Sequence, residues 1–290
     1  MIRMTSNRRL MLDELQRRNY APTTVQTYLR ILANFSRHFR KAPDRLGAEE
    51  IRQYQVHLFR DRRLSARTVA QHVSALRFFF VKTLRRACLL EHLPMPKQER
   101  RLPVVLSREE VGRLIDGSRT PMQRAMLMTL YGTGMRRQEL VQLKVEDIDS
   151  QRMVIHIHGK GRKDRNVPLS PRLLDSLREY ARGMKLGTYL FPGMRRRCRI
   201  DRPVSTKTVW HACREALERA GIGKRVSPHS LRHSYATHLH EDGVDLYTIQ
   251  LLLGHSDLKH TTVYLHLSGR HLREVKNPLD SIPLAEPRER

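Results

Sequence analysis

Two stretches near the carboxyl end, SPHSLRHSYATHL at Ser227–Leu239 and LLGHSDLKHTTVYL at Leu252–Leu265, decide how this chain is interpreted. With YGTGMRRQEL (131–140) and GKGRKDR (159–165) upstream, they supply six side chains that could act on one group: Arg136, Lys160, His229, Arg232, His255 and Tyr264. Two arginines, two histidines, a lysine and a tyrosine do not suit a metal site or a pair of acid–base carboxylates. They suit a pocket for one phosphodiester, in which the tyrosine is the nucleophile.

Reaction at a phosphodiester accounts for each of these residue types. Negative charge grows on the non-bridging oxygens as a nucleophile arrives, and the planar fork of arginine holds that charge well. A tyrosine hydroxyl, with a reference pKa of about 10, needs cations or a base nearby before it attacks. The departing 5′-oxygen needs an acid, which histidine or lysine can supply. Every requirement has a candidate here, so we expect no metal ion or other cofactor.

The order of these residues resembles the tyrosine recombinase family, which includes phage integrases and Xer-type enzymes. The family's first-arginine box falls on TGMRRQEL, its β-turn lysine on Lys160, its H-x-x-R box on His229 and Arg232, its LLGH box on His255, and its nucleophile on Tyr264. The run RRLPVVLSREEV together with YGTGMR is especially similar to integron integrases, although the extra insertion of those enzymes has no equivalent here. A second departure is Thr261-Thr262-Val263-Tyr264, because many members have two residues between the threonines and the tyrosine.

The resemblance implies a fold that is mainly α with a small β-sheet, namely a four-helix SAM-like core-binding domain followed by an α+β catalytic domain. It implies a site-specific DNA recombinase or integrase, as in mobile elements, that cleaves and rejoins strands through a 3′-phosphotyrosine without metal or ATP. Arg136 and Arg232 would clamp the phosphate, His229 would assist proton transfer at Tyr264, and Lys160 would protonate the 5′-oxygen. His255 would position the phosphate or share that acid role. The expected partner is double-stranded DNA, bound in a C-shaped clamp, with a homotetramer on two DNA sites.

Composition agrees with a nucleic-acid partner. The 290 residues carry a formal net charge of +26, and the isoelectric point is about 11.0. Such a chain is expected to bind a polyanion. No membrane segment is expected, because no run approaches 18 apolar residues and the basic charge is spread throughout. Three widely spaced cysteines, Cys88, Cys198 and Cys213, indicate reduced thiols in a cytoplasmic protein.

The pattern of the chain predicts a helical core-binding domain at 1–90, a proline-rich basic linker at 91–103, a catalytic domain at 104–276 and a tail at 277–290. In the first domain, helices are expected near Leu10, after a cap at Thr23, at Glu49–Phe59 and from Ser65 or Ala66. In the second, a capping box at Ser107 and Glu110 starts a helix, and further helices are expected at 122–131, 171–184, 206–220, 228–240 and 246–253. Strands are expected at 153–158 and 165–169, around a basic hairpin turn.

Simpler interpretations stay open for several residues. His233 and His238 lie with His229 on one helix but lack cysteine or carboxylate partners, so packing or capping is favoured over a metal site. The His156-x-His158 pair is likewise interpreted as structural. Tyr264 taken alone could belong to the core.

Two further functions also stay open. A type IB topoisomerase-like enzyme would share the pocket but relax DNA without exchanging partners, and a DNA-binding regulator would have kept the fold and lost catalysis. None of the six residues is lost, and the helical amino-terminal domain favours recombination. A metal-dependent nuclease or transposase is disfavoured, because no carboxylate trio is apparent in the sequence.

Overall fold

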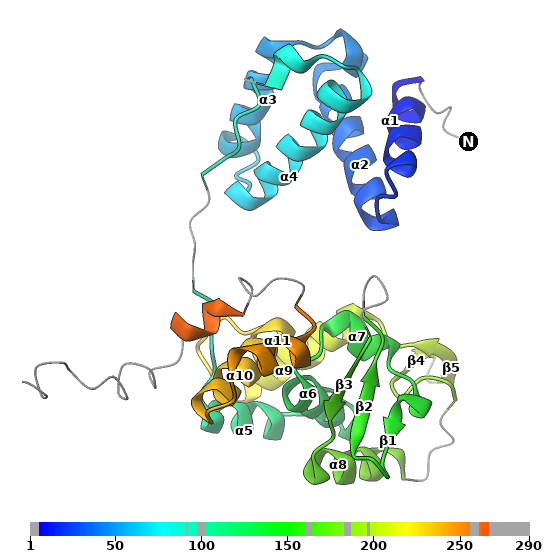
Figure 1. The fold of residues 1–290 in the computed structure, drawn as a ribbon, viewed down its shortest axis with the longest axis vertical. Coiled ribbons are helices and arrows are strands. Elements are labelled where there is room, and N and C mark those ends of the chain that lie inside the picture. Colours follow the sequence, from blue (N-terminus) through cyan, green and yellow to red (C-terminus); the bar gives the residue numbers. More distant parts are fainter. Residues whose placement is uncertain are drawn as a thin grey trace, which may run out of the picture. The chain divides into compact units, whose positions relative to one another are not determined.

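The chain folds into two compact units, Met1–Arg101 and Leu102–Arg290 (Figure 1). The computed structural model describes residues 6–90, 92–97, 102–159, 164–182, 187–195, 198–255 and 261–266. The predicted site residue Lys160 and the tail at 277–290 therefore lie outside the described residues.

The amino-terminal unit contains the four expected helices, α1 (Ser6–Arg17), α2 (Pro22–Phe39), α3 (Ala48–Arg60) and α4 (Ala66–Arg77). Short 3₁₀ turns lie at Pro43–Arg45 and Ala87–Leu90, and a π-helical segment, Phe78–Thr83, continues α4. The core includes fully buried aliphatic and aromatic side chains from all four helices and from the π-helical segment, among them Met11, Leu15, Phe35, Ile51, Val73, Phe79 and Phe80.

The start of α2 corrects one expectation. Thr23 was predicted to cap this helix, but the N-cap residue is Ala21, which makes no side-chain cap bond, and Pro22 is the first helical residue. Proline suits that position because its φ is already helical and its missing N–H would have no partner within the helix. The helix therefore begins without a hydroxyl cap.

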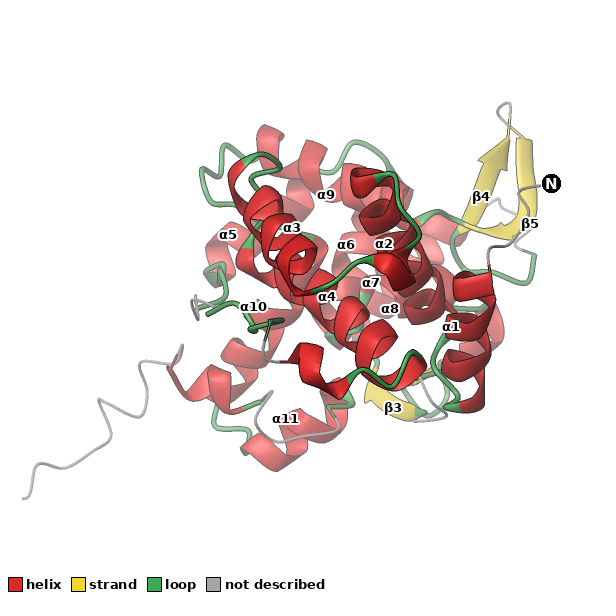
Figure 2. Ribbon diagram, turned by 90° about the horizontal axis from the view of Figure 1, so that it is seen from above, coloured by secondary structure: helices red, strands yellow, loops and turns green. Residues whose placement is uncertain are grey.

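The carboxy-terminal unit is mixed. Its helices are α5 (Arg108–Asp116), α6 (Pro121–Thr133), α7 (Arg137–Gln142), α8 (Pro171–Ala181), α9 (Thr206–Arg219), α10 (Pro228–Glu241) and α11 (Leu246–Leu253). One sheet has the order β1 (Ile148–Asp149), β2 (Val154–Ile157) and β3 (Arg165–Pro168), and β4 (Pro192–Arg195) pairs with β5 (Cys198–Pro203). Figure 2 shows this mainly helical composition, with the strands in yellow. The predicted fold class is confirmed.

The sheets contain more strands than the sequence indicated. The antiparallel pair β2–β3 was expected, and its register places Ile155 opposite Val167, both fully buried. Strand β1 was missed because two residues are too few to show an alternating pattern. The β4–β5 hairpin was also missed, since a strand that begins with proline and glycine and continues into arginines has little strand propensity.

Helix α6 lies at the centre of this unit and packs against α8, α9 and α10. Its buried residues cover a wide face of the helix, while Pro121 and Arg124 on the remaining side are exposed. Two predicted helix starts are confirmed around it. Ser107 and Glu110 form a reciprocal capping box at α5, and Ser227 is the N-cap of α10 with Pro228 at the first position. These ends determine where the functional side chains emerge.

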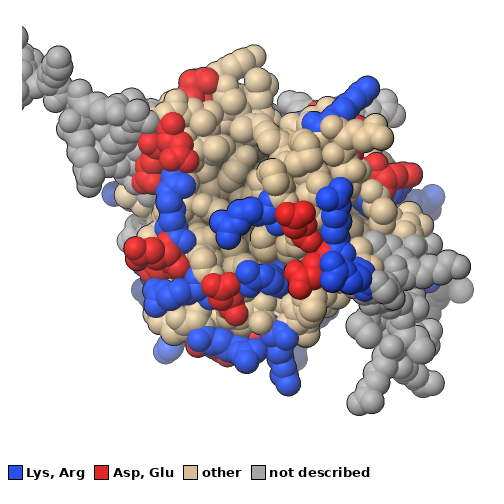
Figure 3. All heavy atoms as spheres, turned by 90° about the horizontal axis from the view of Figure 1, so that it is seen from below, with Lys and Arg blue, Asp and Glu red and all other residues tan. Residues whose placement is uncertain are grey.

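One face of the surface carries both basic and acidic side chains. On the face shown in Figure 3, basic side chains alternate with acidic ones and form no single uninterrupted basic patch. Surface ion pairs such as Arg124–Asp116 (2.8 Å) and Lys224–Glu110 (2.6 Å) are part of this pattern in the carboxy-terminal unit. Among the described residues, no helix has the length and apolar character needed to cross a bilayer.

Candidate active site

Five of the six predicted site residues line one cavity of about 380 Å³ in the carboxy-terminal unit. The lining side chains come from the segment before α5, from the N-cap of α7, from α10, from the second residue after α11 and from the short helix Thr262–His266: Pro103, Arg136, His229, Arg232, His233, His255, Val263 and Tyr264. Segments more than 100 residues apart in the sequence therefore meet here. Lys160 cannot be placed, because it lies outside the described residues.

Arg232 is the most deeply buried charged side chain of this cavity, with 1% of its surface exposed. Its guanidinium donates to the carbonyl oxygens of Gly134 (2.8 Å) and Leu253 (2.7 Å). Both acceptors are neutral, so within the described part of the chain no carboxylate forms an ion pair with it. Burial, and then the neighbouring Arg136, lower the pKa of Arg232 to about 9. A buried cation without a counterion is costly, and an anion in the cavity would offset that cost.

Two left-handed glycines direct carbonyl oxygens at the arginines. Gly134 (φ 60°) ends α6 and Gly254 (φ 62°) ends α11. A β-carbon at Gly134 would collide with the ring of Tyr235 and lie 2.9 Å from Leu253. Both the backbone angle and the lack of space therefore require glycine at position 134. The turn at Gly134 thereby presents a carbonyl oxygen to Arg232, and the turn at Gly254 presents one to Arg136.

Arg136 is held by its own helix. As the N-cap residue of α7, its main-chain N–H donates to Oε2 of Glu139 (2.7 Å), and its guanidinium donates to Oε1 (2.8 Å). A further bond reaches the carbonyl oxygen of Gly254 (3.2 Å). Glu139 therefore supports Arg136 from one helical turn away. The Arg136 side chain stays 39% exposed, so it can meet a ligand from solvent.

Arg165 was not predicted to belong to this site. It lies at the start of β3, and its guanidinium donates to Oε2 (2.8 Å) and Oε1 (3.2 Å) of Glu139 and to the carbonyl oxygen of Leu252 (2.7 Å). Burial alone would raise the pKa of Glu139, but the hydrogen bonds from Arg165 and Arg136 keep it below its usual value. The ionised carboxylate therefore joins the two arginines. In the sequence, Arg165 is only one more basic residue after the hairpin turn.

Tyr264 is buried, with 1% of its surface exposed, and packs against Ala236, Ile249 and Leu253. Its hydroxyl nevertheless lies at the cavity, 3.2 Å from Nδ1 of His233. Burial raises the pKa of Tyr264, while Arg232 and Arg136 act in the opposite direction. Tyr264 can therefore belong to the core through its ring and still present its hydroxyl to the cavity.

His233 contacts the hydroxyl of Tyr264 in addition to the packing that the sequence favoured. Burial, followed by the charges of His229 and Arg232, lowers its pKa to about 4. A neutral imidazole can accept the hydroxyl proton of Tyr264 in their hydrogen bond. The His229 ring stacks edge-on against it at 4.5 Å between centroids. The signal that could have identified His233 is its spacing four residues after His229, one helical turn further along α10.

His255 is oriented by the threonine whose position departed from the family pattern. Its Nδ1 lies 2.9 Å from Oγ1 of Thr261, which is fully buried. The main-chain N–H of Tyr264 donates to the carbonyl oxygen of the same threonine (3.0 Å). The rings of His255 and Tyr264 are nearly parallel, 6.5 Å apart. Thr261 therefore connects the histidine to the tyrosine.

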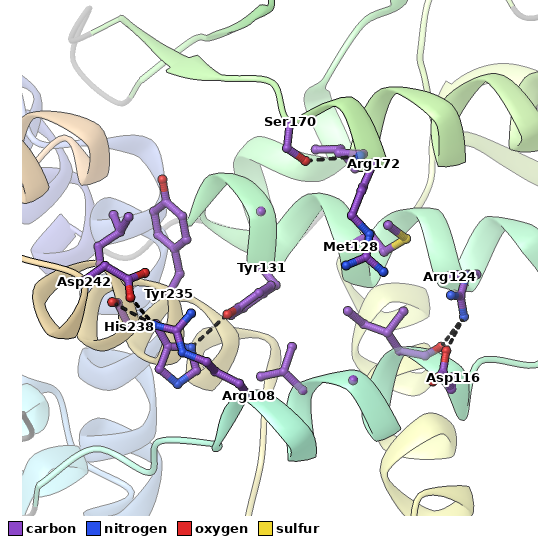
Figure 4. Close-up of a pocket in the computed structure, with 16 residues that line it drawn as sticks. Arg108, Asp116, Arg124, Met128, Tyr131, Ser170, Arg172, Tyr235, His238 and Asp242 are labelled. Atoms are coloured by element: carbon purple, nitrogen blue, oxygen red, sulfur yellow. Dashed lines mark hydrogen bonds and ion pairs between the residues drawn. The ribbon is translucent and has the colours of Figure 1, made fainter. Parts of the chain in front are cut away.

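A second cavity, of about 440 Å³, lies between α5, α6, α8 and α10 and contains none of the six predicted residues (Figure 4). The hydroxyl of Tyr131 lies 2.8 Å from Nδ1 of His238, and Arg108 pairs with Asp242 at 2.7 Å. These contacts agree with the packing role expected for His238.

Comparison with protein families gives two matches that together span most of the chain. Residues 104–271 match the phage integrase family, and residues 8–88 match the phage integrase N-terminal SAM-like domain.

Individual proteins similar to this chain are consistent with the family match. The chain is 43% identical to a putative integrase/recombinase, y4qK, of Sinorhizobium fredii, over 98% of this chain and 92% of the relative. It is 38% identical to the tyrosine recombinase XerA of Thermococcus kodakarensis, over 88% and 89%. Among solved structures, the XerH site-specific recombinase in a post-cleavage complex with palindromic difH DNA is similar with a TM-score of 0.70 and 22% identity, over 93% of this chain and 83% of that one.

Proposed function

Because this chain belongs to the phage integrase family of tyrosine recombinases, and is thus a site-specific recombinase acting on DNA, we propose that Tyr264 is its nucleophile. In this proposal, Tyr264 attacks a phosphorus atom of one DNA strand and forms a 3′-phosphotyrosyl bond. The reaction draws on no metal ion, nucleotide or other cofactor.

The observation that carries the proposal is the buried guanidinium of Arg232 beside the hydroxyl of Tyr264. Arg232 has carbonyl oxygens but no carboxylate as hydrogen-bond acceptors in the described part of the chain, and Arg136 enters the same cavity. Two cations that line one cavity would stabilise a phosphorane-like charge there, and losing one such donor typically slows a reaction about a hundred- to thousandfold. A nucleophile lining this cavity suits phosphoryl transfer better than any hydrolysis of neutral substrates.

Each of the other residues has a place in the proposed step. As the Tyr264 oxygen bonds to phosphorus, its proton passes to His233 or His229, and the bond from phosphorus to the 5′-oxygen breaks. Lys160 donates a proton to that departing oxygen, and His255 positions the phosphate or shares this role. In the reverse reaction, a 5′-hydroxyl from a partner strand attacks the phosphotyrosine and releases Tyr264. The bond energy is conserved, so no ATP is required.

The larger assembly is part of the same proposal. Residues 1–90 would grip duplex DNA opposite the catalytic domain at 104–276, connected by 91–103. Four copies would assemble on two DNA sites, with the tail at 277–290 docking on a neighbour. The DNA-bound relative XerH supports duplex DNA as the partner.

The deciding experiment is Tyr264→Phe on a DNA substrate that traps the covalent intermediate. We expect covalent adducts to disappear while DNA binding stays within about twofold, because the change removes one hydroxyl. The matched control is Tyr247→Phe, since Tyr247 is 66% exposed and lies outside the cavity. Adducts should also form in excess EDTA. Adducts that persist in Tyr264→Phe would show that the nucleophile is elsewhere.

The two alternatives give different results in the same experiment. A topoisomerase-like enzyme would form adducts and relax supercoiled DNA but would not join strands from two sites. A regulator without catalysis would bind DNA and form no adduct in the wild type. Adduct formation and strand exchange between two labelled sites, measured together, therefore separate all three functions.

A further inference from the structure

Outside the active site, three side chains on the β2–β3 hairpin converge on one point. They are His156, His158 and Asp164, and one ligand atom from each lies within 4.8 Å of the other two. Oδ2 of Asp164 is 3.3 Å from Nδ1 of His158 and 3.9 Å from Nε2 of His156. All three side chains are about half exposed, so an ion from solvent can reach them. The sequence alone favoured a structural role for this histidine pair.

The orientation of each histidine follows from its other partner. Nδ1 of His156 lies 2.8 Å from the amide oxygen of Asn166, which can only accept, so this nitrogen carries the proton and Nε2 has the free lone pair. His158 lies between two carboxylates, because its Nε2 is 3.1 Å from Oδ1 of the buried Asp147 and its Nδ1 is 3.3 Å from Oδ2 of Asp164. Nε2 of His156 and Nδ1 of His158 therefore both face the same oxygen of Asp164.

Asp164 is oriented in the same way. Its Oδ1 accepts the main-chain N–H of Gly159 at 3.0 Å, which leaves Oδ2 for the histidines. That oxygen lies 3.3 Å from Nδ1 of His158 and 3.9 Å from Nε2 of His156, so the three ligand atoms surround one point. Ligands whose second polar atom is held by a carboxylate, a carbonyl or the main chain are the usual arrangement around protein-bound metals.

We propose that His156, His158 and Asp164 bind one divalent transition-metal ion, with Zn²⁺ as the ion that fits this donor set. Two imidazole nitrogens and one carboxylate oxygen are ordinary zinc ligands, with a water molecule as the fourth. At bond lengths of about 2.0–2.1 Å, tetrahedral ligands lie roughly 3.3–3.4 Å apart. The 3.3 Å between Asp164 and His158 matches that value, and the 3.9 Å between Asp164 and His156 is longer, so a side-chain rotation that brings His156 closer completes the site. The ion would join the ends of the connection 159–163, which includes Lys160, and it takes no part in the chemistry at Tyr264.

The test is calorimetric titration of Zn²⁺ into the full, untagged chain. We expect one Zn²⁺ per chain in the tightest class of sites, and a loss of affinity of about a hundredfold or more in His156→Gln and in Asp164→Asn. The asparagine keeps an acceptor for the Gly159 amide, so Asp164→Asn should fold as the wild type does. Asn166→Ala removes no ligand but frees the His156 tautomer, and it should cost about tenfold. The control is His211→Gln, an exposed histidine elsewhere on the unit, which should change nothing.

Two results would overturn the proposal. If the tightest Zn²⁺ site survives in His156→Gln but is lost in His233→Gln, the ion belongs to the catalytic cavity. If Zn²⁺ binds no better than about millimolar to the wild type, the three side chains form a hydrogen-bonded cluster and not a metal site. Covalent adducts formed in EDTA by the metal-free chain keep this question separate from that of the nucleophile.

Discussion

The hydroxyl of Tyr264 lies 3.2 Å from Nδ1 of His233, an imidazole that burial keeps neutral at physiological pH. The sequence suggested His229 as the proton-transfer partner of the tyrosine and packing for His233. The contact makes His233 a second candidate to accept the phenolic proton, one turn along α10 from the first.

The first prediction concerns the pH dependence of stability. The pKa of His233 is 6.5 in the unfolded chain and about 4 in the folded one, so the unfolded chain binds more protons between these values. Stability from this group is fully present above about pH 6.5 and is lost as the pH falls towards 4. His233→Gln should remove up to about 3 kcal/mol of this dependence. The measurement is urea unfolding of both proteins at pH 4.5 and 7.5, and equal pH dependence would contradict the assignment.

The second prediction concerns Arg165. Its guanidinium donates one hydrogen bond to each carboxylate oxygen of Glu139 and a third to the carbonyl oxygen of Leu252. A lysine ammonium lacks the planar geometry needed to make all three bonds. Arg165→Lys should therefore slow cleavage at saturating DNA by about tenfold or more, through loss of the support of Arg136. DNA affinity should change little. Arg152→Lys, at a side chain 85% exposed, is the control with the same change of chemistry. Equal cleavage rates in the two variants would exclude this positioning role.

The third prediction separates backbone strain from crowding. Gly134 and Gly221 have nearly the same φ, 60° and 63°, but a β-carbon at Gly221 meets nothing within 4 Å. Gly221→Ala should cost about 1–2 kcal/mol for the left-handed conformation alone. Gly134→Ala should cost more, because of Tyr235, and should also reduce cleavage by moving a carbonyl oxygen that holds Arg232. Thermal unfolding and cleavage rates measure the two effects, and equal losses in both variants would rule out the crowding.

The fourth prediction tests which residue protonates the departing 5′-oxygen. If Lys160 protonates the 5′-oxygen, Lys160→Ala should recover most of its lost rate on a substrate with a 5′-bridging sulfur, which leaves without a proton. Arg136→Ala and Arg232→Ala should not recover, because they lack charge stabilisation, and each should stay about a hundredfold or more below the wild type. Rescue of His255→Ala in place of Lys160→Ala would move the acid role to His255.

The fifth prediction concerns the basic charge of the amino-terminal unit. Residues 1–100 carry 21 Lys and Arg against 8 Asp and Glu, a net charge of +13, which is half of the +26 for the whole chain. Phosphate contacts by this unit release counterions, so affinity should fall steeply with salt. A fragment from about Arg101 onward should bind DNA far more weakly and with a shallower dependence of log affinity on log salt. The same slope for fragment and full chain would mean that this unit does not grip DNA.

The sequence by itself determined the family, the mainly helical fold and the identity of the expected site residues. Helix boundaries followed from local signals, such as the capping box at Ser107 and the proline after Ser227, because a helix end depends on a few neighbouring residues. The sequence could not indicate strand β1, because two residues are too few to show an alternating pattern. It also could not indicate the β4–β5 hairpin, because the residues of these strands have little strand propensity.

Only the tertiary structure decided which side chains support the site. Arg165 meets Glu139 across 26 residues and His233 meets Tyr264 across 31. Neither pair has a characteristic spacing, because contacts between elements depend on how those elements pack and not on their separation along the chain. The same holds for Arg232, whose charge is unusual only because the folded core surrounds it with carbonyl oxygens and excludes water.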